Sequence, residues 1–410
     1  MNQKVFGSTL TALRKKSGLT QQALAKELNV SDKAVSKWET GLGYPEITLL
    51  PKIAGVFGVS VDYLMTGDRR GITVVGNIIS DVVKNVDCYP AIGMLANISA
   101  VTRAVGGCAP NTAIDLAKID ASLPLSVIGY VGDDEYGRYM ISQLQKNNID
   151  TGKIAVTDQA PTSFSDVMSL PNGERTFFHA KGANALFHPD QIKISELSCR
   201  MLHIGYILLL DQFDAADPEY GTVMARFLHD VQAAGIKTSF DVVSSSSAED
   251  FAAKVIPALK YSDNVIINEI ECCSIWSVSP RTADGRLSIE AIKDAMSKTM
   301  ASGVKEKVIV HSKEAGFCLS ADGTFTIVPS LEIDEKAIKG SVGAGDAYCA
   351  GCLYGLYHQY DDEEMLRFAS AAAACNLFAA NAVDGMRSKN EIDALMASAK
   401  RKTLAQVAAE

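Results

Sequence analysis

The spacing of apolar residues changes at residues 67–71, and this change divides the chain into two units of different architecture. Before residue 67, apolar side chains recur at helical intervals in segments of about eight to ten residues, with breaks such as Ser17-Gly18 between them. After residue 71, β-branched apolar runs of the kind buried in a sheet alternate with helix-like stretches. The sequence therefore predicts a small all-α unit at residues 1–66, a polar linker at residues 67–71 and an α/β unit at residues 72–400.

Alternation of strand and helix predicts a doubly wound, mostly parallel sheet for the second unit. Strands are expected at residues 72–79, 125–128, 201–207, 237–240, 264–267 and 308–310. Helices are expected at residues 109–119, 136–147, 220–234 and 289–301. Ligands on such a sheet bind beyond the carboxyl ends of the strands, so the residues that follow each strand are the candidates for a site.

Charge is divided unevenly between the two units. Residues 1–70 contain 10 Lys and Arg against 6 Asp and Glu, the rest of the chain contains 29 against 42, and together they give the net charge of −9. The first unit, called the head below, is therefore basic, and the second unit is acidic. This charge distribution is compatible with nucleic-acid binding by the head but does not establish it, so sequence motifs are needed. We find no apolar run of about 18 residues and no export-type amino terminus. The 9 cysteines are scattered and odd in number, so we expect a cytoplasmic protein with no membrane partner and no disulfide framework.

Two short helices of the first unit are joined by a tight turn. Thr20 and Ser31 stand where N-caps are expected, because their hydroxyls can accept a backbone N–H of the helix that follows. Helices are therefore expected to begin near Gln21 and Asp32. Asn29 lies in the turn between them and tolerates the left-handed conformation that a helix exit often needs.

The stretch from Leu19 to Gly41 resembles the phage-repressor (XRE) type of helix-turn-helix, and the resemblance covers residues 5 to about 66. It implies that the helix beginning near Asp32 enters the major groove of double-stranded operator DNA. Matching by position places the following residues toward base edges: Asp32, Lys33, Ser36 and Lys37. Gln21 would hold a phosphate from the N terminus of the preceding helix.

Heads of this type usually act in pairs, so the resemblance implies a homodimer and an inverted-repeat operator. Val35 and Trp38 would face inward. The alternative is a helical bundle used only for dimerisation, but exposed Lys33 and Lys37 one turn apart are what that interpretation leaves unexplained.

A glycine-rich stretch at residues 340–351 precedes apolar residues suited to a helix. Small residues at Gly343, Ala344 and Gly345 let backbone N–H groups approach an anion, and the helix N terminus adds a partial positive charge. Asp346 stands beside this site, as expected of a carboxylate that takes a proton from a hydroxyl. Glycine also serves plain turns, so the loop alone is weak evidence.

The sequence from Gly343 to Asp346, GAGD, resembles the signature of the ribokinase-like (PfkB) kinases. Further family elements occur in the family's order at residues 76–81, 106–113, 128–137 and 268–271, and the resemblance spans residues 72 to 395. It implies a ribokinase-like fold with a small β lid, and in-line transfer of the γ-phosphoryl group of ATP to a sugar hydroxyl. Asp346 would be the base, and backbone N–H groups of residues 343–346 would form the anion hole.

The resemblance also implies roles for residues outside this loop. The sugar would be bound by Asn77, Asp81, Gly107 and Asn111. Asn268 and Glu271 would support Mg²⁺ through water molecules, because Mg²⁺ sheds its hydration shell reluctantly. Gly316 and Asn376 would lie near the nucleotide. Residues 162–178, with the hairpin-turn signal Asn172-Gly173, would form part of a lid over the site.

The chain departs from the family pattern at two places. Gly340-Ser341 replaces an Asp-Thr pair whose Asp commonly helps to hold a monovalent cation, so potassium activation is in doubt. Lys313 replaces a glycine at the nucleotide edge. Neither change touches the base or the anion hole, which favours an active sugar kinase fused to a DNA-binding regulator. The alternatives are a catalytically inactive repressor that uses the kinase fold only to sense a sugar, and a metabolic kinase whose head binds no operator.

Other reactive side chains are expected to have structural roles. Cys349 and Cys352 should lie on the helix behind the glycine-rich loop, without a metal or redox function. Histidines with no metal-ligand spacing are expected in loops or at the surface, and they are His179, His188, His203 and His311. Residues 244–247 are expected to form a turn.

Overall fold

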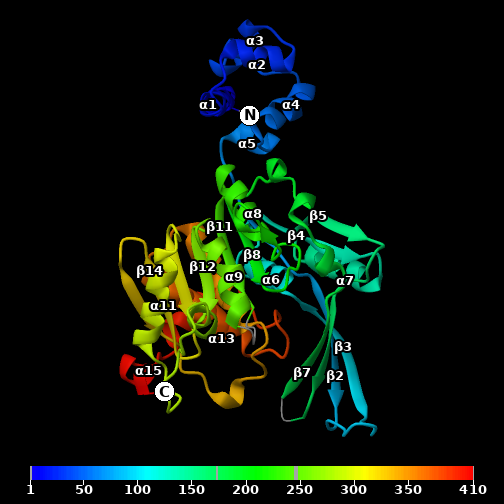
Figure 1. The fold of residues 1–410 in the computed structure, drawn as a ribbon, viewed down its shortest axis with the longest axis vertical. Helices are drawn as coiled ribbons and strands as arrows, with labels where there is room; N and C mark the ends of the chain where they lie inside the picture. Colours follow the sequence, from blue (N-terminus) through cyan, green and yellow to red (C-terminus); the bar gives the residue numbers. More distant parts are fainter. Residues whose placement is uncertain (1, 172–173, 244–247, 410) are drawn as a thin grey trace.

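The computed structural model describes residues 2–171, 174–243 and 248–409. Its first part is a bundle of five helices (Figure 1): α1 (Gln3–Lys16), α2 (Gln21–Leu28), α3 (Asp32–Glu39), α4 (Leu50–Phe57) and α5 (Val61–Thr66). Thr20 accepts a hydrogen bond from the Ala23 N–H at 3.0 Å, and Ser31 accepts one from the Ala34 N–H at 3.2 Å. Asn29 has φ of +58°. The predicted caps and turn of the helix-turn-helix are therefore confirmed.

The second part is built on a nine-stranded sheet in the order β15-β14-β13-β12-β11-β8-β1-β4-β5. Its strands are β1 (Ile72–Val75), β4 (Leu125–Gly132), β5 (Asp150–Thr157), β8 (Met201–Ile207), β11 (Lys237–Val242), β12 (Asn264–Asn268), β13 (Lys307–His311), β14 (Ala315–Ser320) and β15 (Phe325–Pro329). β14 runs antiparallel to both of its neighbours, and the other pairs are parallel. The predicted mostly parallel, doubly wound sheet is confirmed.

Helices cover both faces of this sheet. One apolar core packs α6 (Cys108–Ile119), α7 (Glu135–Lys146), α12 (Ala344–His358), α13 (Asp362–Asn376) and α14 (Lys389–Ser398) on one face. The other core packs α8 (Val223–Ala233), α9 (Ala248–Leu259), α10 (Glu269–Ser274) and α11 (Ile289–Ala301). The chain continues past residue 400 into α15 (Leu404–Ala409), where Val407 is fully buried. Among the described residues, none of these helices has the length and apolar character needed to cross a membrane.

The expected strand at residues 72–79 is two strands in two different sheets. β1 ends at Val75, and Gly76 has φ of +147°, where an added Cβ would lie 2.3 Å from the Gly205 carbonyl oxygen. β2 (Ile79–Val86) then leaves the main sheet and joins β3 (Ile98–Gly106), β6 (Phe164–Ser169) and β7 (Arg175–Ala180) in a separate sheet of order β3-β2-β6-β7. The predicted lid segment supplies two of these strands, and its turn signal Asn172-Gly173 lies outside the described residues, as does the turn expected at residues 244–247.

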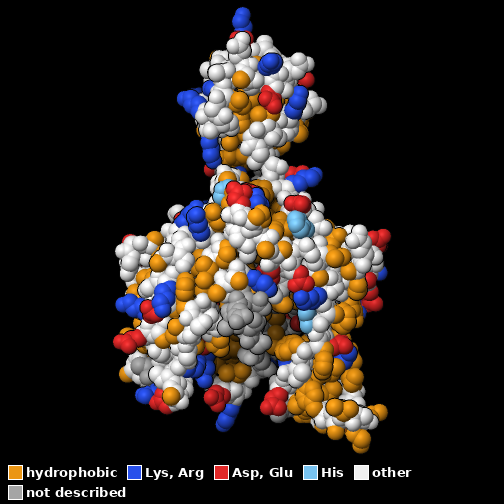
Figure 2. Space-filling view, in the orientation of Figure 1, with side chains coloured by type: hydrophobic (Ala, Val, Ile, Leu, Met, Phe, Trp, Pro, Cys, Tyr) orange, Lys and Arg blue, Asp and Glu red, His pale blue; other side chains and the backbone are white. Residues whose placement is uncertain are grey.

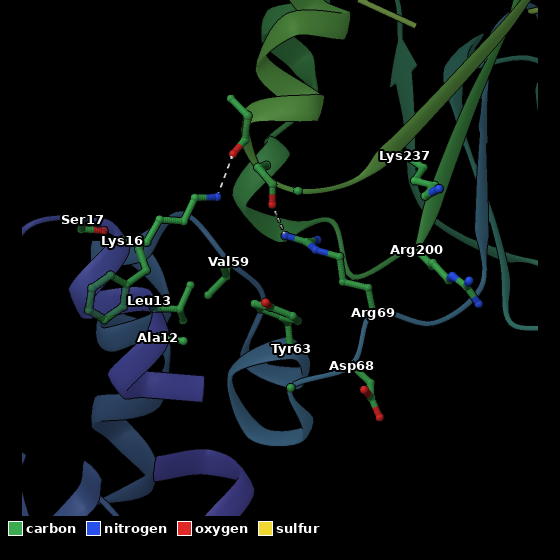
Figure 3. Close-up of a pocket in the computed structure, with 15 residues that line it drawn as sticks. Ala12, Leu13, Lys16, Ser17, Val59, Tyr63, Asp68, Arg69, Arg200 and Lys237 are labelled. Atoms are coloured by element: carbon green, nitrogen blue, oxygen red, sulfur yellow. Dashed lines mark hydrogen bonds between the residues drawn. The ribbon is translucent and has the colours of Figure 1, made fainter. Parts of the chain in front are cut away.

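The head projects from the α/β part at the end opposite the small sheet, with α2 and α3 farthest out (Figures 1 and 2). Arg69 joins the two parts, donating a hydrogen bond to the Leu197 carbonyl at 2.7 Å. It donates another to the Ala234 carbonyl at 2.8 Å (Figure 3). Its guanidinium also lies over the Tyr63 ring of the head, 4.7 Å from the centroid. The chain between α5 and β1 is therefore docked on both parts.

Candidate active site

The glycine-rich loop ends in the N terminus of α12. Gly343 has φ of +78° and immediately precedes the helix, and a Cβ there would lie 2.5 Å from the Ala382 carbonyl oxygen. Asn376 supports the loop by donating its amide to the Val342 carbonyl at 3.0 Å. The first turn of a helix leaves backbone N–H groups without intrahelical partners, and Gly345 and Asp346 lie in this turn. The Ala344 N–H donates to the Ser341 carbonyl at 3.2 Å. The anion hole expected at residues 343–346 stays a prediction.

Asp346 lies in this first turn and is only 5% exposed. Asn111 of α6 donates its amide to one carboxylate oxygen at 2.9 Å, and the Tyr206 hydroxyl at the end of β8 donates to the other at 2.9 Å. Burial raises the pKa of Asp346 to about 7, while these two hydrogen bonds act in the opposite direction. A carboxyl that titrates near neutral pH can accept and release a proton under ordinary conditions.

Two of the residues expected to bind the sugar lie close to Asp346, because Asn111 donates to its carboxylate and Asp81 interacts with it electrostatically. Gly107 has φ of +87° at the start of α6, and a Cβ there would lie 2.3 Å from the Asn77 carbonyl oxygen. Burial and then the nearby Asp346 carboxylate raise the pKa of Asp81 to about 6. Within the described structure, the Asn77 amide nitrogen and the Asn111 amide oxygen are buried without a hydrogen-bond partner. A polyhydroxylated ligand could satisfy both atoms.

Asn268 and Glu271 form a reciprocal capping box at the start of α10. The Asn268 side chain accepts from the Glu271 N–H at 2.8 Å, and the Glu271 carboxylate accepts from the Asn268 N–H at 2.9 Å. The three-residue spacing of Asn268 and Glu271 is therefore explained by helix capping, and it does not by itself indicate a metal site. Both side chains line a cavity of about 240 Å³ together with Gly345 and Asp346. Their oxygen atoms fit the ligand preference of Mg²⁺, with water molecules as intermediaries.

Gly316 lies inside β14, and its lack of a side chain has a packing reason. A Cβ there would lie 2.1 Å from the Tyr348 hydroxyl. Lys313 lies exposed in the turn that precedes β14. At Gly340, an added Cβ would lie 3.2 Å from the Ala379 carbonyl oxygen. The nucleotide contacts expected of Gly316 and Asn376 stay predictions.

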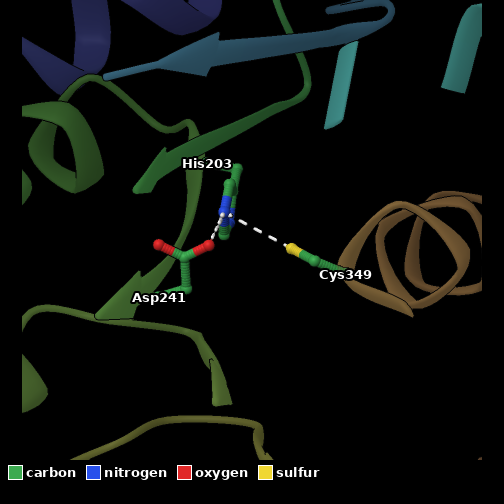
Figure 4. Close-up of side chains that lie close together, drawn as sticks. All are labelled: His203, Asp241 and Cys349. Atoms are coloured by element: carbon green, nitrogen blue, oxygen red, sulfur yellow. Dashed lines mark hydrogen bonds and ion pairs between the residues drawn. The ribbon is translucent and has the colours of Figure 1, made fainter. Parts of the chain in front are cut away.

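A buried cluster beneath Asp346 was not predicted. His203 lies within 3.5 Å of the Asp241 carboxylate and 3.4 Å of the Cys349 sulfur (Figure 4). Burial lowers the pKa of His203 to about 3 and raises that of Asp241 well above its ordinary value, so burial favours the neutral form of each group. His203 lies on β8 and is fully buried, and His311 ends β13, so the expected loop or surface position is wrong for both. Cys349 lies on α12 as predicted.

Three functional candidates were not predicted from the sequence. Tyr206 and Asp241 occupy the ends of two predicted strands and line the cavity beside Asp346, so the rule that ligands bind beyond strand ends could have found them. Arg175 of β7 donates to the Ala380 carbonyl at 2.8 Å and its charge lowers the pKa of Asp81. Arg175 is the only Lys or Arg in residues 162–178, and this could have marked it as a candidate in the sequence.

The helix-turn-helix presents α3 to solvent. Asp32, Lys33 and Lys37 are exposed and Ser36 is half-buried, whereas Val35 and Trp38 are buried in the head's core as predicted. The side-chain amide of Gln21 donates one hydrogen to Glu39 at 2.8 Å, and Glu39 is also paired with Arg14. The second hydrogen of this amide is not used in that bond, so the phosphate contact expected of Gln21 stays a prediction.

Comparison with known proteins gives two family matches. The model for pfkB family carbohydrate kinases matches residues 69–389, and a helix-turn-helix model matches residues 10–64. A 5-dehydro-2-deoxygluconokinase of Shouchella clausii is 24% identical over 307 residues, covering 72% of this chain and 87% of its own. Fructokinase-1 of Oryza sativa is 24% identical, covering 82% of this chain and all of its own. The structure of Arabidopsis thaliana ribokinase complexed with ribose and ATP has a TM-score of 0.65 at 19% identity, covering 80% of this chain and 98% of that chain.

Proposed function

Because the chain belongs to the PfkB family of carbohydrate kinases, which are phosphotransferases with an alcohol group as acceptor, we propose that it transfers the γ-phosphoryl group of ATP to a sugar hydroxyl and binds operator DNA through its head. The two family resemblances stated from the sequence are confirmed. The observation that carries the kinase proposal is the buried Asp346 at the N terminus of α12, with both carboxylate oxygens held by donors from other elements. Two related structures, the ribokinase of Arabidopsis thaliana and a ribokinase II of E. coli, are complexes with ATP, which supports its use here.

In this mechanism the sugar hydroxyl donates its proton to Asp346 as its oxygen attacks the γ-phosphorus in line with the leaving ADP. Asn77, Asp81, Gly107 and Asn111 hold the sugar in this orientation. The N–H groups of the first turn of α12 stabilise the equatorial phosphoryl oxygens, and preorganised donors of this kind are often worth about 3 kcal/mol each. Mg²⁺, supported by Asn268 and Glu271 through water, would neutralise phosphate charge. Asn111 is both a sugar ligand and a positioning residue for the base.

An ATP-turnover assay with a panel of acceptors tests the kinase proposal. Fructose, ribose, a keto-deoxy sugar acid and a nucleoside represent the acceptors suggested by the relatives' names and by the fold. We expect one class to give ATP-dependent turnover that is lost in Asp346→Asn. The alternative, an inactive sugar sensor, would give sugar binding without turnover on any of them.

Tyr206 should be a positioning residue for the base, and its removal should change the pH profile. Tyr206→Phe deletes one of the two hydrogen bonds that favour the charged form of Asp346, so the pKa of Asp346 should rise further. Because the charged form is the active base, kcat/KM falls as pH drops through this pKa. We expect the acidic limb to move to higher pH, with about a tenfold loss at pH 7 that is largely recovered at pH 9. A loss that is the same at every pH would show that Tyr206 has only a structural role.

A dimer is proposed because a repressor-type head reads two half-sites, and the small sheet offers a surface for it. Its exposed apolar side chains gather at the far end of the molecule from the head (Figure 2). Those more than half exposed are Ile92, Met94, Leu95, Ile98, Val101, Phe177 and Phe178. A contiguous apolar patch of this kind usually marks an interaction site, and a second copy would bury it.

A further inference from the structure

A cavity of about 640 Å³ lies at the junction between the head and the α/β part (Figure 3). Its walls come from α1, α4 and α5 of the head, from the linker, from the residue just before β8 and from the α8–β11 turn of the α/β part. Small-molecule sites usually measure about 300–1,000 Å³ and often lie between domains. The junction therefore has the size and place of a ligand site.

Four basic side chains line this cavity, against one acidic side chain, Asp68. They are Lys16 of α1, Arg69 of the linker, Arg200 just before β8 and Lys237 at the start of β11. Lys16 and Arg69 come from the head and the linker, whereas Arg200 and Lys237 belong to the α/β part. Basic side chains therefore lie on both walls of the cavity (Figure 3). Asp68 is mostly exposed and pairs with Arg70 outside the cavity lining.

Three of these cations donate to uncharged partners. Lys16 contacts the Ala233 carbonyl at 3.4 Å, Arg69 uses the carbonyls of Leu197 and Ala234, and Arg200 donates to the Tyr357 carbonyl at 3.2 Å. Lys237 is paired with Glu306. Burial lowers the pKa of Arg69, which means that desolvation of its charge is not fully compensated. The cavity thus holds an excess of positive charge that a bound anion would balance.

We propose that the junction binds a small phosphate monoester, held by Lys16 and Arg69 on one wall and by Arg200 and Lys237 on the other. Arginine suits this ligand because its planar donors match a phosphate in bidentate geometry. The site goes beyond the proposed function, because it is a second ligand site separate from the transfer site.

The junction and the active site lie at opposite ends of the same two strands. Arg200 precedes β8, at whose far end Tyr206 bonds Asp346, and Lys237 begins β11, at whose far end Asp241 lines the active-site cavity. A strand rises about 3.3 Å per residue, so the two sites are separated by roughly 15–20 Å. A ligand that touches both walls of the junction favours one orientation of the head, because it binds that arrangement better than any other.

Hydrogen exchange of the full chain with fructose 6-phosphate as the probe tests the site where it lies. We expect the ester to slow amide exchange in residues 63–70 and 232–238, while fructose does not. Lys16→Gln/Lys237→Gln should weaken the ester's effect at least tenfold in concentration. The matched control Lys293→Gln/Lys298→Gln removes two exposed charges from α11 and should behave like the wild type.

All four lysines are exposed, so both double variants should fold, and equal melting temperatures would verify this. The proposal is overturned if millimolar ester leaves the junction peptides unchanged in the wild type. It is also overturned if fructose slows them equally, or if the junction variant responds like the control. None of these readouts depends on catalysis, so a failed kinase assay would leave this test intact.

Discussion

Asp346→Asn is expected to lower kcat by at least about a hundredfold, the usual scale for losing a general base. An amide at this position cannot take the proton of the sugar hydroxyl, but it keeps the shape of the side chain between Asn111 and Tyr206. Sugar and ATP affinities should therefore stay within a few-fold of the wild type. Steady-state kinetics and calorimetric titration measure the two quantities separately. A variant that keeps more than a tenth of the wild-type kcat would show that Asp346 is not the base.

The same substitution should stabilise the fold at pH 8, which separates lost chemistry from lost structure. The pKa of Asp346 is about 7 in the folded protein, whereas its ordinary value is 3.8. A raised pKa means that the folded state holds the proton more tightly, so stability is lost as pH rises from about 4 to about 7 and stays lower above that range. The amide of the variant carries no charge to bury. A melting temperature of the variant below that of the wild type at pH 8 would contradict this prediction. The lost activity would then be explained by a destabilised fold.

Lys33→Ala is expected to weaken operator binding by about 1–3 kcal/mol and to blur the preference at one base pair. Lys33 is exposed on α3, which lies at the end of the head farthest from the α/β part (Figure 1). Binding titrations against the operator and against single-base variants of it measure both effects. Lys52→Ala on α4 is the matched control, because it removes an exposed head lysine that the resemblance does not place at the DNA. Equal weakening on every sequence would make Lys33 a phosphate contact instead.

The operator itself should be an inverted repeat with half-sites about one helical turn apart. Footprinting of the wild type should therefore show two protected half-sites. Protection of a single unpaired half-site would contradict a dimeric repressor.

The sequence predicted the main sheet well because its strands are continuous apolar runs between helices. The expected strands at 201–207 and 264–267 agree closely with β8 and β12. It missed the break at Gly76, because the reason for that glycine is the approach of Gly205, far away in the sequence. It also missed β2 and β3 as lid strands, because most of β3 is exposed and carries no buried-strand pattern.

The candidate site was predictable where a residue meets a local requirement of the backbone, and not where its role depends on a distant contact. Motif residues such as Gly107 and Gly343 need positive φ and close backbone contacts, which leaves a visible mark in the sequence. Tyr206 has no such local requirement, since its role depends on a hydrogen bond to a residue 140 positions away. The burial of His203 likewise depends on the packing of α12 against the sheet.

Coupling between a sugar site and an operator site on one chain can be measured in Asp346→Asn, because this variant does not consume the sugar. The head is docked on the α/β part through Arg69, so a change of shape on sugar binding can reach it. Titration of labelled operator with the variant, at saturating acceptor sugar and without sugar, should give dissociation constants that differ by about 5- to 150-fold. Equal dissociation constants under the two conditions would contradict the account and show that the head and the kinase merely share a chain.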